Sequence, residues 1–294
     1  MKKRITALLL TGIVACGTIL TGCGSEDTKT EQKTEKETEK AEGKSEIYGA
    51  MEGVTLEWNG PSYKPYRYMD ENGDYVGYDF DVVNALSEIL GFEYNYTEAE
   101  FAGTLAAIGS GTVDFMGTVG ATDERKETMD FTRAYYVPKT AVLVKEDSGI
   151  DGYSDLVGQR VCGVLGSIFA KNGEQIKDVD FFTVDSDALL GVEEVIAGRA
   201  DAIISESVEL AGYQENYPET KVVVLNDDPD IDFDLLVSSY HYAFKNDSEY
   251  VDLFNQALDI LAEDGTLAQI QEKWLGEENI TDWSGFDAYA PATE

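Results

Sequence analysis

From residue 53 onward the chain alternates between short apolar runs and longer segments with apolar residues three or four positions apart. The first pattern predicts strands and the second predicts amphipathic helices. The first half contains predicted strands at Gly53–Trp58, Phe92–Tyr96 and Val113–Met116, and predicted helices at Phe80–Leu90, ending at Gly91, and Phe101–Ile108, ending near Gly109. Alternation of this kind implies mostly parallel α/β layers.

A second set of the same kind follows from Val142. Its predicted strands are Arg160–Val164, Asp180–Val184, Asp201–Ile204 and Lys221–Leu225. One predicted helix follows Gly166-Ser167, and a second spans Asp187–Ala197. A strand at Tyr240–Phe244 and helices at Ser248–Leu261 and Leu267–Trp274 close the pattern. Two such sets imply two α/β lobes, and a ligand then favours the crevice at the carboxyl ends of the strands.

Asn72-Gly73 lies between two aromatic-rich segments, Tyr66–Met69 and Tyr75–Tyr78, and this predicts a hairpin. Asp70, Asn72 and Asp74 have the spacing of the start of a calcium loop. Tyr75, however, stands where that loop needs glycine, so we favour the hairpin and predict no metal site.

The N-terminus has the features of an export signal. Lys2, Lys3 and Arg4 precede the uncharged apolar run Ile5–Leu20, which is short for a membrane-spanning helix. The alternative is an anchor that is retained. Leu20-Thr21-Gly22-Cys23 resembles the lipobox of bacterial lipoproteins, which implies a signal peptide at 1–22 and lipidation of Cys23. Residues 23–47 then form a tether rich in Glu, Lys and Thr, expected to be disordered because it has almost no large apolar residue.

The net charge is −35, which argues against nucleic acid and anionic lipid headgroups as partners. A local arginine can still bind an anionic group, and the acidic surface favours ligands with a cationic part. Of the three cysteines, Cys16 leaves with the signal and Cys23 carries the lipid. Cys162 lies in an apolar run and is expected to be a buried strand residue, since no histidine is near it.

The segment Asp114–Tyr136 holds the most specific chemistry. Gly117, Thr118, Gly120 and Thr122 leave backbone N–H groups accessible, and Arg125 follows at the start of a predicted helix. Such amides and a guanidinium form a good receptor for a carboxylate. The alternative is a Gly-rich turn before a helix with a surface arginine.

Seven segments in order resemble the bacterial extracellular solute-binding proteins, family 3, that serve amino-acid ABC transporters. They are Lys64–Tyr66, Gly73–Asp81, Asn84–Leu86, Asp114–Tyr136, Val161–Ser167, Gly198–Ile204 and the C-terminal helices. The resemblance implies a two-lobe, type II periplasmic-binding-protein fold of the α/β class with a ligand cleft between the lobes. It places lobe 1 at 48–140 plus 241–294 and lobe 2 at 141–240, with hinge strands near Tyr136–Val144 and Leu235–Tyr242.

The resemblance also implies the roles of six ligand-binding residues. Tyr63 packs on the ligand, Arg125 grips its carboxylate, and Thr118 and Gly120 supply amides or a hydroxyl. Ser167 reaches the carboxylate from lobe 2, and Glu206 holds the ammonium group. Two of these depart from the family, which usually has Ser or Thr where Gly120 stands and aspartate where Glu206 stands. Asp79 and Asp81 are expected to serve as helix N-cap and packing residues.

The predicted function is therefore capture, by lobe closure, of an amino acid or similar carboxylate-bearing solute. The resemblance implies delivery to an ABC transporter permease by a monomer held by its lipid on the extracytoplasmic face of the cell membrane. No enzyme activity or cofactor is predicted, because the single histidine, His241, has no catalytic partner in the sequence. Two alternatives stay open: a ligand-sensing protein for a separate receptor, and a dehydratase-like enzyme on the same fold.

Overall fold

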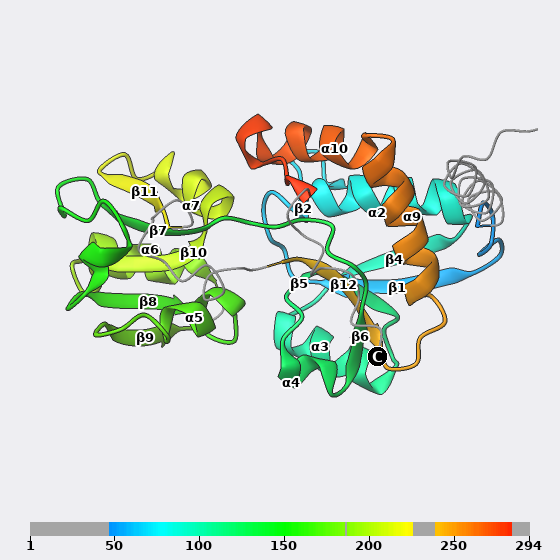
Figure 1. The fold of residues 1–294 in the computed structure, drawn as a ribbon, viewed down its shortest axis with the longest axis horizontal. Coiled ribbons are helices and arrows are strands. Elements are labelled where there is room, and N and C mark those ends of the chain that lie inside the picture. The colour runs from blue at the N-terminus through cyan, green and yellow to red at the C-terminus, as the bar shows by residue number, and fades with distance from the viewer. Residues whose placement is uncertain (1–46, 186, 226–238, 284–294) are drawn as a thin grey trace, which may run out of the picture. The chain divides into compact units, whose positions relative to one another are not determined.

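The computed structural model describes residues 47–185, 187–225 and 239–283. The predicted signal peptide, Cys23 and nearly all of the tether lie outside these residues, as does the start of the second predicted hinge. The described part contains two five-stranded sheets and a small hairpin (Figure 1). None of the helices in it is both long and apolar enough to span a bilayer.

The first sheet has the strand order β4-β1-β5-β12-β6. The central strand β5 pairs in parallel with β1 and antiparallel with β12, which arrives from the far end of the chain. The bounds are β1 Thr55–Gly60, β4 Glu93–Glu98, β5 Phe115–Val119, β6 Met129–Phe131 and β12 His241–Lys245.

The second sheet repeats this topology, with the order β9-β8-β10-β7-β11. Here β7 is the strand that follows directly from the first lobe, and it is antiparallel to both of its neighbours. The bounds are β7 Thr140–Lys145, β8 Arg160–Val164, β9 Asp180–Val184, β10 Ala202–Glu206 and β11 Thr220–Val224. Each sheet therefore contains one reversed strand next to a crossing between the lobes.

The two crossing segments contact each other directly. Tyr136 and Tyr240 form an isolated antiparallel bridge, in which the Tyr240 amide donates to the Tyr136 carbonyl at 2.8 Å. Tyr240 immediately precedes β12 and Tyr136 lies four residues before β7, both within the segments where the sequence predicts the hinges. The proposed lobe limits at 140/141 and 240/241 stay predictions.

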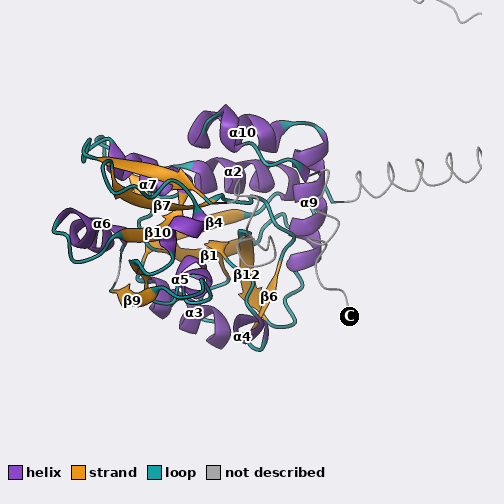
Figure 2. Cartoon of the chain, turned by 60° about the vertical axis from the view of Figure 1, so that its left-hand side comes forward, coloured by secondary structure: helices purple, strands orange, loops and turns teal. Residues whose placement is uncertain are grey.

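Helices cover both faces of the first sheet (Figure 2). Three helices, α2 (Tyr78–Leu90), α9 (Val251–Glu263) and α10 (Thr266–Leu275), pack together on one side, and α3 (Phe101–Ser110) and α4 (Asp123–Lys126) lie on the other. The second sheet carries α5 (Ile168–Gly173), α6 (Ala188–Ile196) and α7 (Ser207–Gln214). Short 3-10 helices span Tyr153–Leu156 and Glu277–Asn279.

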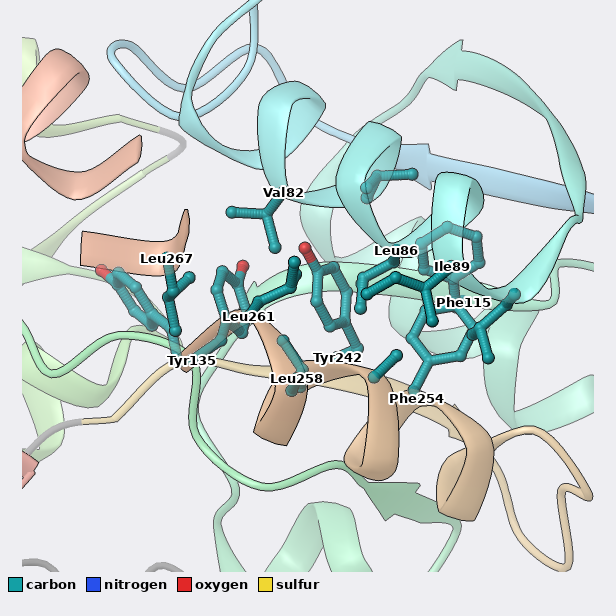
Figure 3. Packing of buried hydrophobic residues seen from close by; sticks show 14 of the residues in the cluster. Val82, Leu86, Ile89, Phe115, Tyr135, Tyr242, Phe254, Leu258, Leu261 and Leu267 are labelled. Atoms are coloured by element: carbon teal, nitrogen blue, oxygen red, sulfur yellow. The ribbon is translucent and has the colours of Figure 1, made fainter. Parts of the chain in front are cut away.

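The main core lies between the first sheet and α2, α9 and α10 (Figure 3). Val82, Leu86 and Ile89 project from α2 toward Leu258 and Leu261 of α9, with Tyr135, Tyr242 and Phe115 between them. The rings of Tyr135 and Tyr242 stack with centroids 4.4 Å apart, which positions the segment before β7 against β12.

In the second sheet, neighbouring residues of one strand face opposite cores. Val142 and Val144 pack in one cluster and Ala141 and Leu143 in the other, as the period of two requires. Cys162 of β8 is fully buried in the second cluster, so the prediction of a buried strand residue is confirmed.

The structure corrects several local predictions. Helix α3 ends at Ser110 and uses Gly111, with φ 72°, as its C-cap, where Gly109 was expected. Gly77 occupies the N-cap of α2, so Asp79 and Asp81 lie in its first turn and are not caps. The predicted hairpin is confirmed as β2 (Tyr68–Met69) paired with β3 (Tyr75–Val76).

Candidate ligand-binding site

A cavity of about 400 Å³ lies where segments of the two sheets meet, which is the size range of sites for small solutes. Five of the six predicted site residues line it: Tyr63, Thr118, Gly120, Arg125 and Ser167. Glu206 does not belong to the described lining; its neighbours Ser205 and Glu209 do. The cavity walls therefore come from the loop after β1, the end of β5, α4, and the starts of α3, α5, α6 and α7.

Arg125 enters the cavity from the short helix α4. Thr122 caps that helix with its hydroxyl oxygen, which accepts from the Arg125 amide at 3.4 Å. The guanidinium donates from Nη1 to the Gly120 carbonyl at 2.8 Å and from Nη2 to the Gly166 carbonyl of lobe 2 at 3.0 Å. No described Asp or Glu forms an ion pair with it. Burial lowers the pKa of Arg125, but an arginine remains charged at neutral pH.

Thr118 is engaged by groups of its own lobe. Its amide donates to the Tyr135 hydroxyl at 2.7 Å, and its hydroxyl oxygen accepts from Arg67 Nη1 at 2.6 Å and bonds to Asp79. Because both polar groups have protein partners, the geometry gives Thr118 the role of holding Arg67. Its predicted contact with the ligand stays a prediction.

Arg67 is a second cavity-lining arginine, which the sequence analysis did not single out. Its side chain is 1% exposed and paired with Asp79, which is fully buried. Asp79 also accepts from the Tyr135 hydroxyl at 2.7 Å, so its carboxylate is saturated with donors. The pair is neutral as a unit, and it leaves Arg125 as the unpaired cation of the described lining.

Gly120 has a steric reason to be glycine. A Cβ at this position would lie 2.9 Å from Cδ1 of Ile168, which belongs to α5 of lobe 2. Real Cβ contacts are essentially never that short. An isoleucine from lobe 2 therefore takes the space that a serine or threonine side chain would need.

Ser167 is the N-cap of α5. Its hydroxyl oxygen accepts from the Ala170 amide at 3.0 Å, and its own amide donates to the Val164 carbonyl at 3.0 Å. The hydroxyl proton is the group of Ser167 that a ligand in the cavity can still use. Its ligand role stays a prediction.

Glu206 is the last residue of β10 and is fully buried. Its two oxygens accept from the hydroxyls of Tyr63 at 3.1 Å and Tyr66 at 2.6 Å, both on lobe 1. Burial, as the largest cause, and repulsion from Glu209, as the second, raise the pKa of Glu206 to about 8. Phenol donors stabilise the carboxylate only in part, because no described cation pairs with it.

Glu209 lies one helical turn further on, in α7. Its Oε2 accepts from the Ser205 hydroxyl at 2.5 Å and from the Tyr63 hydroxyl at 3.4 Å. Burial raises the pKa of Glu209 to about 7. The sequence carried one usable signal for this residue, since a position three after Glu206 falls on the same face of a helix that begins there.

The two walls of the cavity are thus electrostatically opposite. Among the described residues, Arg125 presents a positive charge without an acidic partner, and Glu206 and Glu209 form an acidic pair without a basic one. A ligand that carries a carboxylate and an ammonium group complements both walls. Within the described residues there is no cluster of His, Cys, Asp or Glu able to hold a metal ion.

Comparison with known proteins agrees with this geometry. The sequence model of bacterial extracellular solute-binding proteins, family 3, matches residues 59–277. The chain belongs to this family. Membership confirms the predicted resemblance and the expectation that the chain is a binding protein and not an enzyme.

The individual relatives have similar lengths. The arginine-binding extracellular protein ArtP of Bacillus subtilis is 30% identical over 282 residues, which is 95% of this chain and 100% of that protein. The probable amino-acid-binding protein YxeM of the same organism is 28% identical over 285 residues, covering 94% and 96%. A solved ancestral arginine-binding protein bound to arginine has a TM-score of 0.65 at 29% identity, covering 77% of this chain and all of that one, 100%. These similarities confirm the type II fold.

Proposed function

We propose that this chain captures an amino acid in the cavity beside Arg125 and delivers it to the permease of an ABC transporter. The observation that carries the proposal is the half-buried guanidinium of Arg125, bonded to one carbonyl from each lobe and to no described carboxylate. A ligand carboxylate would add the missing negative charge, and the acidic pair on the other wall would receive the ammonium group. The names of relatives, which include arginine-binding proteins, support this ligand class.

Capture would proceed by closure of the two lobes about the crossing segments. In support, polar contacts already join lobe 1 to lobe 2, among them Tyr63 to Glu206, Arg125 to the Gly166 carbonyl, and Glu124 to Lys171. Closure around a ligand removes water from the charged groups and strengthens their pairing. A ligand that lacks one of its charges would leave a buried partner unpaired, which gives selectivity.

The test uses calorimetry with L-arginine, L-glutamine, L-histidine and L-cystine on purified protein. We expect at least one to bind the wild type, and Arg125→Ala to weaken that binding by about 3 kcal/mol, or on the order of 100-fold, since an ionic partner is lost. Lys126→Ala is the matched control, because Lys126 is the next cation of α4, half exposed and paired with Asp123 at 3.7 Å.

The control should bind like the wild type. Equal affinity of Arg125→Ala and wild type would remove Arg125 from the site. Failure of all four amino acids to bind the wild type, in a parallel screen that finds another solute, would move the proposal to that solute class.

We also propose that the mature protein is a monomer held on the extracytoplasmic face of the cell membrane by lipid on Cys23, with acyl chains that include palmitate. The support is the Leu20–Cys23 motif after an apolar run of signal-peptide length. More than one acyl chain anchors a protein stably, whereas one does not.

Expression of the full chain in a bacterial host that processes lipoproteins tests the anchor. We expect the wild type in the membrane fraction, extractable by detergent, and Cys23→Ala to lose this association. A Cys16→Ala variant is the control, since Cys16 lies within the predicted signal peptide. Retention of Cys23→Ala in the membrane would favour an uncleaved N-terminal anchor.

A further inference from the structure

The two acidic residues beside the cavity differ in their access to it. Glu206 is fully buried, lies outside the described lining, and has both oxygens engaged by Tyr63 and Tyr66 across the lobes. Glu209 lines the cavity together with Ser205. A ligand in the cavity can therefore contact Glu209 directly, whereas Glu206 lies behind the cavity wall.

The other two acids that line the cavity, Asp187 and Glu100, are placed differently from Glu209. Asp187 lines it too, but its Oδ1 accepts from the Leu189 amide at 2.8 Å as the N-cap of α6. Glu100, at the N-cap position of α3 on lobe 1, is exposed, and its side chain makes no cap hydrogen bond. Glu209 is neither a cap nor part of an ion pair with a described residue, and its two hydrogen bonds both use Oε2.

We propose that Glu209 is the carboxylate that contacts the ammonium group of the bound amino acid, and that Glu206 is a latch that joins the lobes through Tyr63 and Tyr66. This division of roles rests on the proposed function, since it assumes an amino-acid ligand. It moves the ammonium contact from the position that family resemblance indicates to the next turn of α7.

Tyr63 connects the two roles. Its hydroxyl has one proton to donate and lies 3.1 Å from Glu206 Oε1 and 3.4 Å from Glu209 Oε2. When an ammonium group satisfies Glu209, the phenol proton is available to Glu206, and the contact between the lobes is strengthened. Burial raises the pKa of both acids, Glu209 to about 7 and Glu206 to about 8, so a nearby ammonium group would favour the ionised carboxylate.

The experiment compares L-arginine with its analogue that lacks the α-amino group, 5-guanidinopentanoic acid, by calorimetry on the full folded protein. We expect Glu209→Gln to weaken L-arginine binding on the order of 10- to 100-fold and to change binding of the analogue little, since the analogue has no ammonium group to lose. Glu206→Gln should weaken both probes by a similar factor, because a latch acts on closure and not on one ligand group. Glu215→Gln, which removes the same charge from the exposed end of α7, should change neither.

A second measurement needs no ligand. Small-angle scattering of the unliganded protein should show a larger radius of gyration for Glu206→Gln than for wild type, and the wild-type value for Glu209→Gln.

The proposal is overturned if Glu209→Gln affects both probes equally, or if Glu206→Gln affects L-arginine alone. If L-arginine fails to bind the wild type, the same pair of measurements is made with L-glutamine and its analogue without the α-amino group. If none of the four amino acids binds, the proposed function fails together with the role of Glu209, and scattering still decides the latch.

Discussion

Gly120 and Ile168 form a matched pair across the lobes. Glycine leaves room for the isoleucine, whose Cδ1 would be 2.9 Å from any Cβ at position 120. The departure from the family's usual Ser or Thr is thus tied to a particular side chain on the opposite lobe. The glycine gives up the hydrogen bond that a Ser or Thr side chain would offer in the cleft, and the apolar side chain of Ile168 occupies that space.

We expect Gly120→Ala to weaken amino-acid binding about 5-fold, or about 1 kcal/mol, because the lobes must separate slightly or Ile168 must change rotamer. The double variant with Ile168→Ala should regain most of the loss. Titration calorimetry with a bound amino acid measures both. Gly103→Ala is the control, since a Cβ there meets nothing within 4 Å. A single variant with wild-type affinity, or a double variant that is weaker still, would contradict this steric account.

Arg125 could be found from sequence because its local pattern is self-contained: a strand end, small residues and a helix start. Helical spacing from Glu206 is the one sequence signal for Glu209, and Arg67 has none, because the roles of both depend on contacts between distant segments. Tyr63 and Glu209 are 146 residues apart, and Arg67 and Thr118 are 51 apart. A sequence pattern predicts which residues share a face of one element, but not which faces meet.

At the scale of elements, periodicity predicted the alternation of strands with helices, but it did not predict the elements β6, β7 and α7. Strand β7 is buried along five of its six residues, so it shows no alternation, and an apolar run of this kind fits a helix as well. Strand β6 has 3 residues, and α7 has only Ser207 and Leu210 buried, which leaves a weak helical pattern. These elements exist because tertiary packing favours them.

The two reversed strands show how the fold makes a two-sided site. β12 brings the end of the chain into the first sheet, and β7 brings the first lobe's chain into the second. The bridge between Tyr136 and Tyr240 ties both crossings at one point. Rotation about this point would separate Arg125 from Glu209 without breaking either sheet, as the proposed capture by closure requires.

Across the whole molecule, the charge of −35 makes buried acids costly unless protons or ligands neutralise them. Glu206 and Glu209 are the clearest case, since burial raises their pKa values from the ordinary 4.5 to about 8 and about 7. An amino acid's ammonium group would replace the proton as the neutralising charge. The same two residues therefore link ligand binding to the stability of the unliganded protein.

The unliganded protein should lose stability through these acids as pH rises from about 5 to 8. Between the ordinary pKa and the raised ones the folded state holds more protons than the unfolded state, so the free energy of unfolding falls with increasing pH. We expect the variant Glu206→Gln/Glu209→Gln to lack this contribution. The thermal unfolding midpoint of the wild type, relative to that of the variant, should then drop by about 4–8 °C over this range. This corresponds to a loss on the order of 2 kcal/mol in the free energy of unfolding.

Scanning fluorimetry at constant ionic strength, at four pH values from 5 to 8, measures this difference. Glu215→Gln/Glu219→Gln is the matched control, because it removes the same two charges from exposed positions and should give a difference that changes little with pH. Addition of a bound amino acid should remove most of the wild-type loss at pH 8, since its ammonium group then compensates the ionised pair. A difference between wild type and double variant that stays constant from pH 5 to 8 would show that the pair ionises as ordinary surface carboxylates do.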